Sequence, residues 1–536
     1  MILTTKDTVH KTERCISTDN TACLERGAAA TTFLSPVFAH LPPVTRLVTD
    51  SREVQPGDTF VAYPGAKSDG RRFIAQAIAR GANAVIYEKH MPGHPHEAQH
   101  FVWDAAWHVA NVAVTDLRHK AGWLADSVYG SPSEHLWMVG VTGTNGKTSS
   151  AHWIAQCLDE TGKKCALIGT LGNGFSGELQ ATANTTPDAI RMHGLLAEYL
   201  AKKARAVAME VSSHALTQGR VNGVNFGVAL LTNLSRDHLD YHGDMESYAA
   251  AKRRLFDWQT LKFAVINLDD AFGAELALQL RDQDLEVIGY GLSEAALHMA
   301  ERHGMRMVYG KLLEMSAQGM RLDIRSSWGA GELKSSMIAG FNAANLLGVL
   351  AVLLVSDVEL SPALRALSKV AAVPGRMQRV GSEGQPAVIV DYAHTPDALE
   401  KVLLALRAIN AAANGKLICV FGCGGERDRG KRAMMGRVAE KFSDTCIVTS
   451  DNPRSEDPQQ IIDEVVSGMT LKNHVIMADR AAAIAHAIGM AGIDDIVLIA
   501  GKGHENYQEI QGVRQPFSDV AASRRALATA EIGGAQ

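Results

Sequence analysis

The chain has 536 residues, of which 46% are hydrophobic and 21% are charged, and its formal net charge is −5. This length exceeds what a single core supports, so we expect about three domains. The composition is typical of a soluble globular protein, and the charge gives no indication of a nucleic-acid or membrane surface. The longest apolar run, residues 346–355, is too short to span a bilayer, and the N-terminus shows no secretory signal.

The seven cysteines are scattered along the chain. Cys419 and Cys423 are spaced as CxxxC without matching His or Cys partners nearby, which disfavours a zinc site. Free thiols in a reducing compartment fit better, so we expect a cytoplasmic protein.

Residues 1–30 are polar without apolar periodicity, which indicates a mobile leader. Residues 31–133 read as a small N-terminal α/β domain that ends in a linker at Ser131-Pro132-Ser133. Its expected elements are a strand at 59–63, a helix at 73–81 and a strand at 84–87.

Residues 134–373 read as a central domain in which strands and helices alternate. A buried strand at 136–141 runs into a glycine-rich turn, and a helix begins near Thr148. Further strands are expected at 164–170, 205–211, 227–233, 263–267 and 286–290, with helices such as 149–160 and 189–204 between them. This alternation predicts a mostly parallel sheet with right-handed crossovers, of the type that carries a phosphate-binding loop.

Residues 374–536 read as a Rossmann-like C-terminal domain, reached through a hinge at Val373-Pro-Gly-Arg376. Strands are expected at 387–391, 416–421, 445–449, 474–477 and 495–500. In such sheets ligands bind beyond the carboxyl ends of the strands, which is where the polar clusters of this domain fall. The fold class is therefore α/β with three domains.

The most informative segment is Thr142-Gly-Thr-Asn-Gly-Lys-Thr148, which follows a strand and opens a helix. Gly143 and Gly146 allow the backbone to approach a phosphate closely, and the N–H groups at the helix start bind its oxygens. Lys147 would place a cation on the outer phosphates, and the Thr148 hydroxyl would face Mg²⁺. The alternative is an ordinary strand–turn–helix with a surface lysine. The context favours ATP binding.

Three polar clusters of the central domain add a candidate metal site: Glu210-Val-Ser-Ser-His214, Asn233-Leu-Ser-Arg-Asp-His238 and Lys252. A carboxylate at a strand end beside a phosphate loop is a suitable ligand for Mg²⁺. Taken alone, Glu210 could be a carboxylate buried by accident of its position at a strand end, which is costly without a partner, and His238 could be a structural histidine. Their co-occurrence favours the metal site.

The C-terminal domain contributes Asp391-Tyr-Ala-His394, Gly422-Cys-Gly-Gly425, Asp451-Asn-Pro-Arg454 and Gly501-Lys-Gly-His-Glu505. Proline fixes the turn before Arg454, so its guanidinium is suited to bidentate capture of a carboxylate. The alternative is that Arg454 pairs with a neighbouring acid of the chain.

These motifs, together with Asn184-Thr-Thr-Pro187, resemble the Mur ligases of peptidoglycan synthesis over roughly residues 45–515. Among them, the Asn-Pro-Arg turn is similar to that of the members that add diaminopimelate as the third stem residue. The resemblance implies an ATP-dependent, amide-forming acid–amino-acid ligase. Its substrates would be UDP-N-acetylmuramoyl-L-alanyl-D-glutamate and meso-2,6-diaminopimelate, joined through an acyl phosphate. We expect a monomer without nucleic-acid or integral-membrane contacts.

The resemblance also assigns roles to residues. Catalytic roles fall on Lys147, Lys252, His238, Asp391 and His394. Mg²⁺ would be bound by Thr148, Glu210, His238 and Lys252, the last as an N6-carboxylysine formed with CO₂. ATP would contact Gly143, Thr144, Asn145, Gly146, Lys147, Thr148, Ser149, Asn267, Asp270, Asn342 and Arg376. The UDP-muramoyl dipeptide would contact Ser51, Ala66, Lys67, Ser68, Asn184, Thr185, Thr186, Ser212, Gln218 and Arg220. Diaminopimelate would contact Arg427, Asp451, Asn452, Pro453, Arg454, Gly501 and Glu505.

Three other activities are compatible with parts of the pattern. A lysine-adding Mur ligase usually lacks the Asn-Pro-Arg turn. A folylpolyglutamate synthase-like ligase should lack both this turn and the separate N-terminal domain. A nucleotide-dependent switch protein would tolerate the loss of metal or amine-site residues, all of which are intact here.

Overall fold

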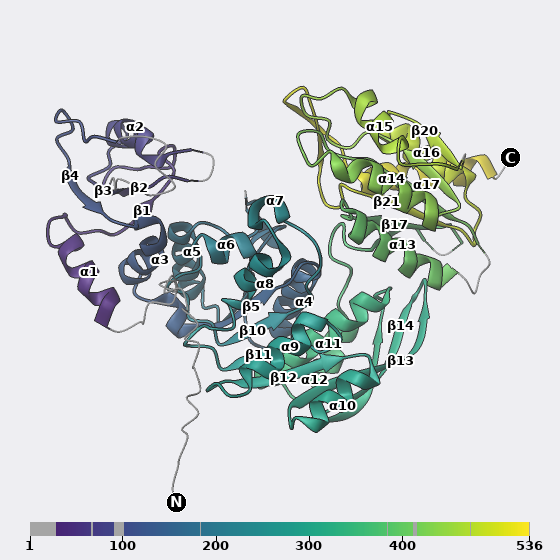
Figure 1. Cartoon of the computed structure of the whole chain (residues 1–536), viewed down its shortest axis with the longest axis horizontal. Coiled ribbons are helices and arrows are strands. Elements are labelled where there is room, and N and C mark those ends of the chain that lie inside the picture. The colour runs from purple at the N-terminus through teal and green to yellow at the C-terminus, as the bar shows by residue number, and fades with distance from the viewer. Residues whose placement is uncertain are drawn as a thin grey trace, which may run out of the picture. The chain divides into compact units, whose positions relative to one another are not determined.

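The computed structural model describes residues 28–65, 68–89, 101–182, 184–382, 384–410, 415–471 and 473–534. Residues 1–27 of the predicted leader lie outside these ranges. Residues 28–30, the last three of the predicted leader, are the first residues of helix α1 (Ala28–Phe38). The chain divides into two compact units, Met1–Leu117 and Arg118–Gln536 (Figure 1). The domain boundaries at 133 and 373 remain predictions.

The first unit is built on a four-stranded parallel sheet in the order β1-β2-β3-β4. Its strands are β1 (Leu47–Val48), β2 (Thr59–Ala62), β3 (Ala84–Glu88) and β4 (Ala110–Val114), and its short helices are η1 (Gly70–Phe73) and α2 (Ile74–Ala79). Both predicted strands of this unit are present. Phe60, Ile74 and Val85 form its core and are fully buried.

The segment after α3 (Leu117–Val128) differs from the predicted linker. Residues Pro132–His135 form a 3-10 helix, η2, in which Pro132 and Ser133 are buried. The Ser133 hydroxyl accepts a hydrogen bond from the backbone N–H of Asn225 at 3.0 Å. A polar Ser-Pro-Ser sequence therefore packs against the domain that follows it, a contact that composition alone does not reveal.

The central sheet has eleven strands in the order β15-β14-β13-β12-β11-β10-β5-β9-β6-β7-β8. They are β5 (Trp137–Thr142), β6 (Cys165–Gly169), β7 (Gly172–Phe175), β8 (Glu178–Gln180), β9 (Ala206–Glu210), β10 (Val228–Leu231), β11 (Phe263–Asn267), β12 (Glu286–Gly291), β13 (Arg306–Ser316), β14 (Gly319–Ser326) and β15 (Gly329–Ser335). From β13 to β6 the pairing is parallel, as predicted, and antiparallel strands extend the sheet at both edges.

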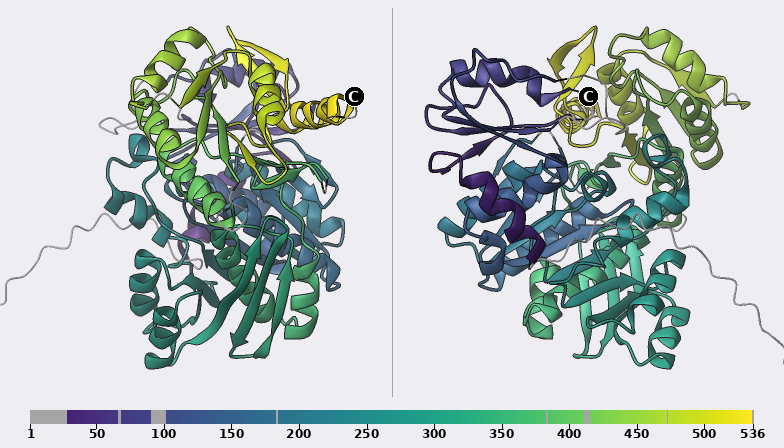
Figure 2. Two further views of the ribbon diagram at one scale, coloured as in Figure 1. Left: turned by 90° about the vertical axis from the view of Figure 1, so that its right-hand side faces the viewer. Right: turned by 60° about the vertical axis from the view of Figure 1, so that its left-hand side comes forward.

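Helices cover both faces of this sheet (Figure 2). The first core contains side chains of α4 (Lys147–Glu160), α11 (Gly340–Val355) and α12 (Leu360–Ser368), and the second contains side chains of α5 (Ala189–Ala201), α9 (Ala271–Leu280) and α10 (Glu294–Arg302). The short helices α6 (Ser213–Thr217), α7 (Leu239–His242) and α8 (Met245–Arg253) lie in the connections after β9 and β10.

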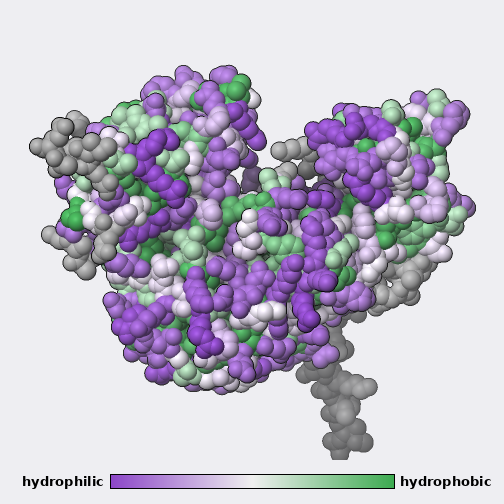
Figure 3. Space-filling model, turned by 180° about the vertical axis from the view of Figure 1, so that it is seen from behind, coloured by the Kyte–Doolittle hydropathy of each residue, from purple (hydrophilic) through white to green (hydrophobic). Residues whose placement is uncertain are grey.

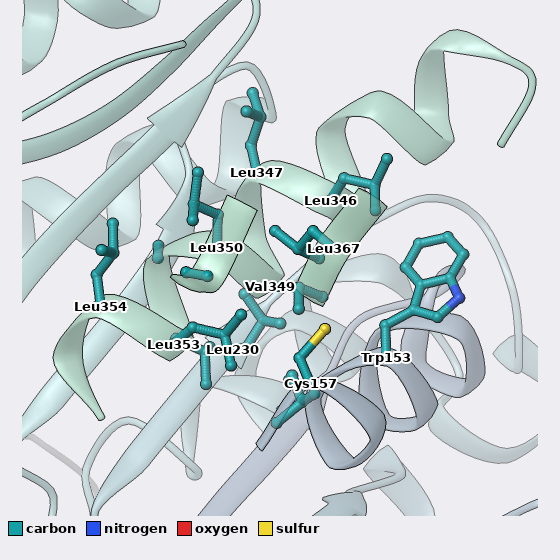
Figure 4. Close-up of a cluster of buried hydrophobic side chains, with 14 of the residues drawn as sticks. Trp153, Cys157, Leu230, Leu346, Leu347, Val349, Leu350, Leu353, Leu354 and Leu367 are labelled. Carbon is teal, nitrogen blue, oxygen red and sulfur yellow. The ribbon is translucent and has the colours of Figure 1, made fainter. Parts of the chain in front are cut away.

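Helix α11 is apolar on nearly every side because it is buried between the sheet and helices α4 and α12. Its leucines pack with Trp153 and Cys157 of α4 and Leu230 of β10 (Figure 4). We expect Leu350→Ala to lower the free energy of unfolding by about 3 kcal/mol, because the truncation leaves a cavity in this core. Urea denaturation would measure the loss. Leu404→Ala, at a 45% exposed position, is the control and should cost much less.

The C-terminal sheet has six strands in the order β16-β17-β21-β18-β19-β20, all parallel except β16. They are β16 (Gln378–Val380), β17 (Ala387–Asp391), β18 (Leu417–Phe421), β19 (Thr445–Val448), β20 (His474–Ile476) and β21 (Ile496–Ala500). One face packs against α13 (Pro396–Asn410), α14 (Gly430–Phe442) and α15 (Pro458–Val466), the other against α16 (Arg480–Met490) and α17 (Asp519–Gly534). The strands β22 (Tyr507–Ile510) and β23 (Val513–Pro516) form a separate two-stranded antiparallel sheet. The predicted three-part α/β fold is confirmed.

Hydrophilic residues predominate on the face shown in Figure 3, with hydrophobic residues scattered among them. None of the helices in the described part of the chain combines the length and the apolar composition needed to cross a membrane. Five cysteines in this part, Cys157, Cys165, Cys419, Cys423 and Cys446, are buried free thiols.

Candidate active site

The phosphate-loop candidate connects β5, in the middle of the central sheet, to α4. Gly143 and Gly146 have φ values of +145° and +88°, which favour glycine. A Cβ at Gly143 would overlap the Thr232 hydroxyl, and one at Gly146 would lie 2.6 Å from Asn345 Oδ1. Lys147 Nζ donates to the carbonyl oxygens of Gly143 and Thr144 at 2.9 Å each, so its ammonium group is hydrogen-bonded to the backbone of its own loop.

A buried acid lies beside this loop. Glu210, at the end of β9, is 1% exposed, and its Oε2 accepts a 2.9 Å hydrogen bond from the Thr148 hydroxyl. Its Oε1 accepts from the backbone N–H of Thr170 at 2.7 Å. The carboxylate and the hydroxyl are hard oxygen donors at a helix N-terminus, a donor set that fits Mg²⁺.

Within the described residues, no group of three or more His, Cys, Asp or Glu side chains is arranged to hold a metal ion. This is compatible with Mg²⁺, which commonly uses one or two carboxylates and takes its other ligands from phosphates and water.

Lys252 is buried, although it lies on α8 next to Arg253 and Arg254. Its Nζ donates to the Gly143 carbonyl at 2.7 Å and lies 4.4 Å from the centre of the Tyr248 ring. Burial, aided by the positive charge of Lys147, holds the pKa of Lys252 well below its usual range. Lys252 is therefore not a solvated lysine on the helix surface.

His238 follows β10 and has a φ of +54°. Its ring centroid lies 4.9 Å from that of His214 and 6.1 Å from that of Tyr248. Partial burial lowers the pKa of His238, although its side chain is 45% exposed. The charge of Asp237, 3.5 Å from its Nε2, raises this pKa, and the charges of Lys147 and Lys252 lower it. The imidazole is therefore held towards its neutral form, which is the form that binds metal ions.

The candidates for the muramoyl dipeptide surround Glu210. The Thr186 hydroxyl donates to the Glu210 carbonyl at 2.8 Å, and Arg220 Nη1 donates to the Thr186 carbonyl at 3.0 Å. Arg220 also donates to Gln218 Oε1, and Ser212 Oγ lies 3.3 Å from Thr186 Oγ1. Thr185 meets Thr170 at 3.1 Å, and Asn184 is exposed beside it. The structure brings these six candidates of the central domain together.

The ATP candidates beyond α4 are Asn267, Asp270, Asn342 and Arg376. Asn267 ends β11 and donates to the Thr232 carbonyl at 2.8 Å, and Asp270 caps α9 and accepts from the backbone N–H of Leu234. Arg376 reaches Thr148 Oγ1 at 3.5 Å and stacks over the Tyr392 ring. Asn342, in contrast, is buried on α11 and donates to a backbone carbonyl of its own segment.

Asp391 and His394 follow β17 in the C-terminal domain. Both Asp391 oxygens accept backbone hydrogen bonds, from Met377 at 2.7 Å and Ala393 at 2.8 Å, so this carboxylate fixes the segment after Arg376. Burial raises the pKa of Asp391. His394 is exposed, and the Ser235 hydroxyl donates to Asp397 at 3.0 Å. The first turn of α13 thus meets the loop after β10.

The amine-site candidates gather at the carboxyl ends of β18, β19 and β21. Arg454 Nη1 donates to the Gly425 carbonyl at 2.6 Å, and Asn452 Nδ2 donates to Glu505 Oε2 at 2.7 Å. Gly501 has a φ of +116°, and a Cβ there would lie 2.6 Å from Asp451 Oδ2. Arg427 is exposed on the loop after β18, and a Cβ at Gly424 would lie 3.8 Å from its Cγ and 3.0 Å from Arg454 Nη1.

Of the N-terminal candidates, Ser51 is buried, and its hydroxyl donates to Gln76 Oε1 at 2.7 Å. The carbonyl of Ser68, whose side chain is exposed, accepts from the backbone N–H of Gly65. Ala66 and Lys67 lie outside the described residues.

The sequence patterns missed several residues of these sites. Tyr248 hydrogen-bonds Thr144 at 3.2 Å, and Asn345 lies against Gly146. Arg432 is fully buried, pairs with both oxygens of Glu456 at 3.0 Å and donates to the Gly424 carbonyl. Lys502 is also fully buried. Tyr248, Asn345 and Arg432 contact residues that are distant in the sequence, so no local pattern indicated them. Lys502 had a local signal, because it lies inside a motif that the sequence analysis singled out.

Fold and site together define an ATP-dependent ligase, and comparisons with known proteins agree. Three family models match: the Mur ligase family catalytic domain at residues 43–129, the Mur ligase middle domain at 141–353 and the Mur ligase glutamate ligase domain at 375–503. The chain belongs to the Mur ligase family. The predicted resemblance is confirmed.

Similar relatives carry one name, UDP-N-acetylmuramoyl-L-alanyl-D-glutamate–2,6-diaminopimelate ligase. The protein from Chromobacterium violaceum is 49% identical over 485 residues, covering 90% of this chain and 94% of the relative. That from Nitrosomonas europaea is 48% identical over 493 residues, covering 90% and 93%. A solved structure of an enzyme of this name has a TM-score of 0.64 at 36% identity, covering 91% of this chain and 96% of the other.

Proposed function

We propose that this chain joins meso-2,6-diaminopimelate to UDP-N-acetylmuramoyl-L-alanyl-D-glutamate at the expense of ATP. The observation that carries the proposal is the co-occurrence of two sites in one chain. One is the phosphate loop with Glu210 and Lys252, and the other is the Arg454 turn with Glu505. The named relatives, which align over nine-tenths of the chain, support the same substrates.

The reaction has two bond-forming steps. The γ-phosphoryl group of ATP passes to the side-chain carboxylate of the D-glutamate, so that an O–P bond forms and ADP leaves. The amine of diaminopimelate then attacks the acyl carbon, a C–N bond forms, and phosphate leaves while the nitrogen loses a proton. Lys147, in the phosphate loop, would offset the charge of the outer phosphates during the first step.

Thr148 and Glu210 would hold Mg²⁺, with His238 and a carbamylated Lys252 as further ligands. A bound Mg²⁺ would offset charge on the transferring phosphoryl group. Two features of Lys252 support its carbamylation: it is buried, and its low pKa favours the neutral amine that reacts with CO₂. The roles of Asp391 and His394, the monomeric state and the cytoplasmic location remain predictions.

The test is phosphate release from the purified chain with ATP, Mg²⁺ and the UDP-muramoyl dipeptide. We expect release to require meso-diaminopimelate, with L-lysine a poor replacement, and a product heavier by one diaminopimelate residue. Release that is indifferent to the added amino acid would reject the proposal. Equal use of L-lysine would favour a lysine-adding enzyme instead. A match of a Mur ligase model to residues 43–129 already argues against a folylpolyglutamate synthase-like enzyme.

A further inference from the structure

Lys502, in the loop after β21, is a fully buried lysine to which the proposed chemistry gives no role. A buried ammonium is costly unless it is paired and hydrogen-bonded. Its Nζ donates to Asn452 Oδ1 at 2.9 Å and to Glu505 Oε2 at 3.2 Å, and it lies 5.6 Å from the centre of the Tyr507 ring. Both hydrogen-bond acceptors are candidates for the diaminopimelate site.

These contacts fix the orientation of the Asn452 amide. A lysine ammonium only donates, so it must face the amide oxygen, and the backbone N–H of Glu509 donates to the same oxygen at 3.0 Å. The amide nitrogen is thereby directed at Glu505 Oε2, 2.7 Å away. Among the described contacts, both side-chain hydrogen bonds of Glu505 end on Oε2. Its Oε1 is the oxygen left for an incoming ammonium.

The same network reaches Arg454 through the β22–β23 hairpin. The backbone N–H of Arg454 donates to the Glu509 carbonyl at 3.0 Å, and the N–H of Gln511 donates to the Arg454 carbonyl at 2.6 Å. Arg454 has a φ of +54°, a conformation that persists only where its surroundings hold it. Asn452 and Glu509 therefore connect the Lys502 contacts to the backbone that carries the Arg454 guanidinium.

We propose that Lys502 is a positioning residue for diaminopimelate: its ammonium fixes the Asn452 amide and the Glu505 carboxylate, so that Glu505 receives the distal ammonium while Arg454 receives the distal carboxylate. The proposal rests on the proposed function. Without Lys502, the Glu505 carboxylate keeps one side-chain hydrogen bond, from Asn452, instead of two, and its orientation is less constrained. The distance between the Glu505 carboxylate and the Arg454 guanidinium is then less well defined.

The variant that tests this is Lys502→Met, which keeps the length of the side chain and removes its charge and donors. We expect the KM for meso-diaminopimelate to rise about tenfold or more, with kcat within about threefold and the KM for ATP within about twofold. Lys502→Arg, which keeps the charge, should recover part of the loss. Lys441→Met, the same change at an exposed position of α14, is the control and should leave all constants unchanged.

A double-mutant cycle with Glu505→Gln separates positioning from general structural damage. If Lys502 acts through Glu505, Lys502→Met should change KM less than about twofold further in the Glu505→Gln background. Multiplicative effects, or equal losses for ATP and diaminopimelate, would overturn the inference. If Lys502→Met does not fold, Lys502→Gln replaces it in the same cycle. A wild-type chain without diaminopimelate-dependent phosphate release would instead reject the proposed function.

Discussion

Replacing Lys252 with methionine is expected to lower kcat by about three orders of magnitude, with a KM for ATP within about threefold of wild type. The proposed carbamate would supply an anionic metal ligand beside the phosphate loop, and methionine supplies none. The loop would still bind nucleotide through its own backbone and Lys147. Steady-state ADP formation measures both constants. Lys262→Met, at an exposed position of the same domain, should have wild-type activity.

Labelled bicarbonate gives this prediction a readout besides activity. We expect a ¹³C carbamate resonance in the wild-type chain after addition of ¹³C-bicarbonate, and no such resonance in Lys252→Met. Because the neutral amine reacts with CO₂, lowering the pH towards the depressed pKa of Lys252 should weaken the resonance and the activity together. Full activity in CO₂-depleted buffer, or in Lys252→Arg, would contradict the carbamate.

The role of Lys252 as a carbamylated metal ligand was predicted by resemblance alone, because burial is not visible in a local pattern. On α8 it stands beside two arginines, and helical position does not distinguish it from them. What separates it is contact with Gly143 and Tyr248, more than a hundred residues away in the first case. Tyr248, Asn345 and Arg432 escaped prediction for the same reason: each is defined by the backbone or side chain that it meets.

The fold was also predictable only where the signal is local. Most parallel strands of the central and C-terminal sheets were predictable, since fully buried strands read as short apolar runs between helices. The antiparallel extension β13–β15 was missed, although β14 alternates buried Met320, Leu322 and Ile324 with more exposed residues. That alternation with a period of two was an available signal. The burial of Pro132 and Ser133 had none, because it depends on a partner in the next domain.

The second large effect is expected at Arg454. Diaminopimelate differs from lysine by one carboxylate, and a guanidinium can hold that group through two parallel hydrogen bonds, whereas an ammonium acts as a point charge. We therefore expect Arg454→Lys to raise the KM for meso-diaminopimelate about fiftyfold, with the KM for ATP within about twofold. Preference for diaminopimelate over L-lysine should fall by a similar factor. Competition between the two amino acids, followed by product mass, measures it directly.

Arg454 has two roles to distinguish: the proposed recognition of the substrate carboxylate, and contacts with neighbouring segments of its own domain. Its Nη1 donates to the Gly425 carbonyl, and its backbone N–H donates to the Glu509 carbonyl in β22. A variant at this position can therefore lose activity because these loops move, and not only because the guanidinium is missing. Arg454→Lys keeps a donor that can reach Gly425, whereas Arg454→Ala removes both functions. If the guanidinium recognises the substrate, Arg454→Lys should lose most of the amino-acid selectivity and Arg454→Ala at least as much, and only Arg454→Ala should also destabilise the domain. Arg524→Lys, exposed on α17, is the matched control. Equal losses in the KM for ATP and for diaminopimelate would place Arg454 in the scaffold of the site rather than in substrate recognition.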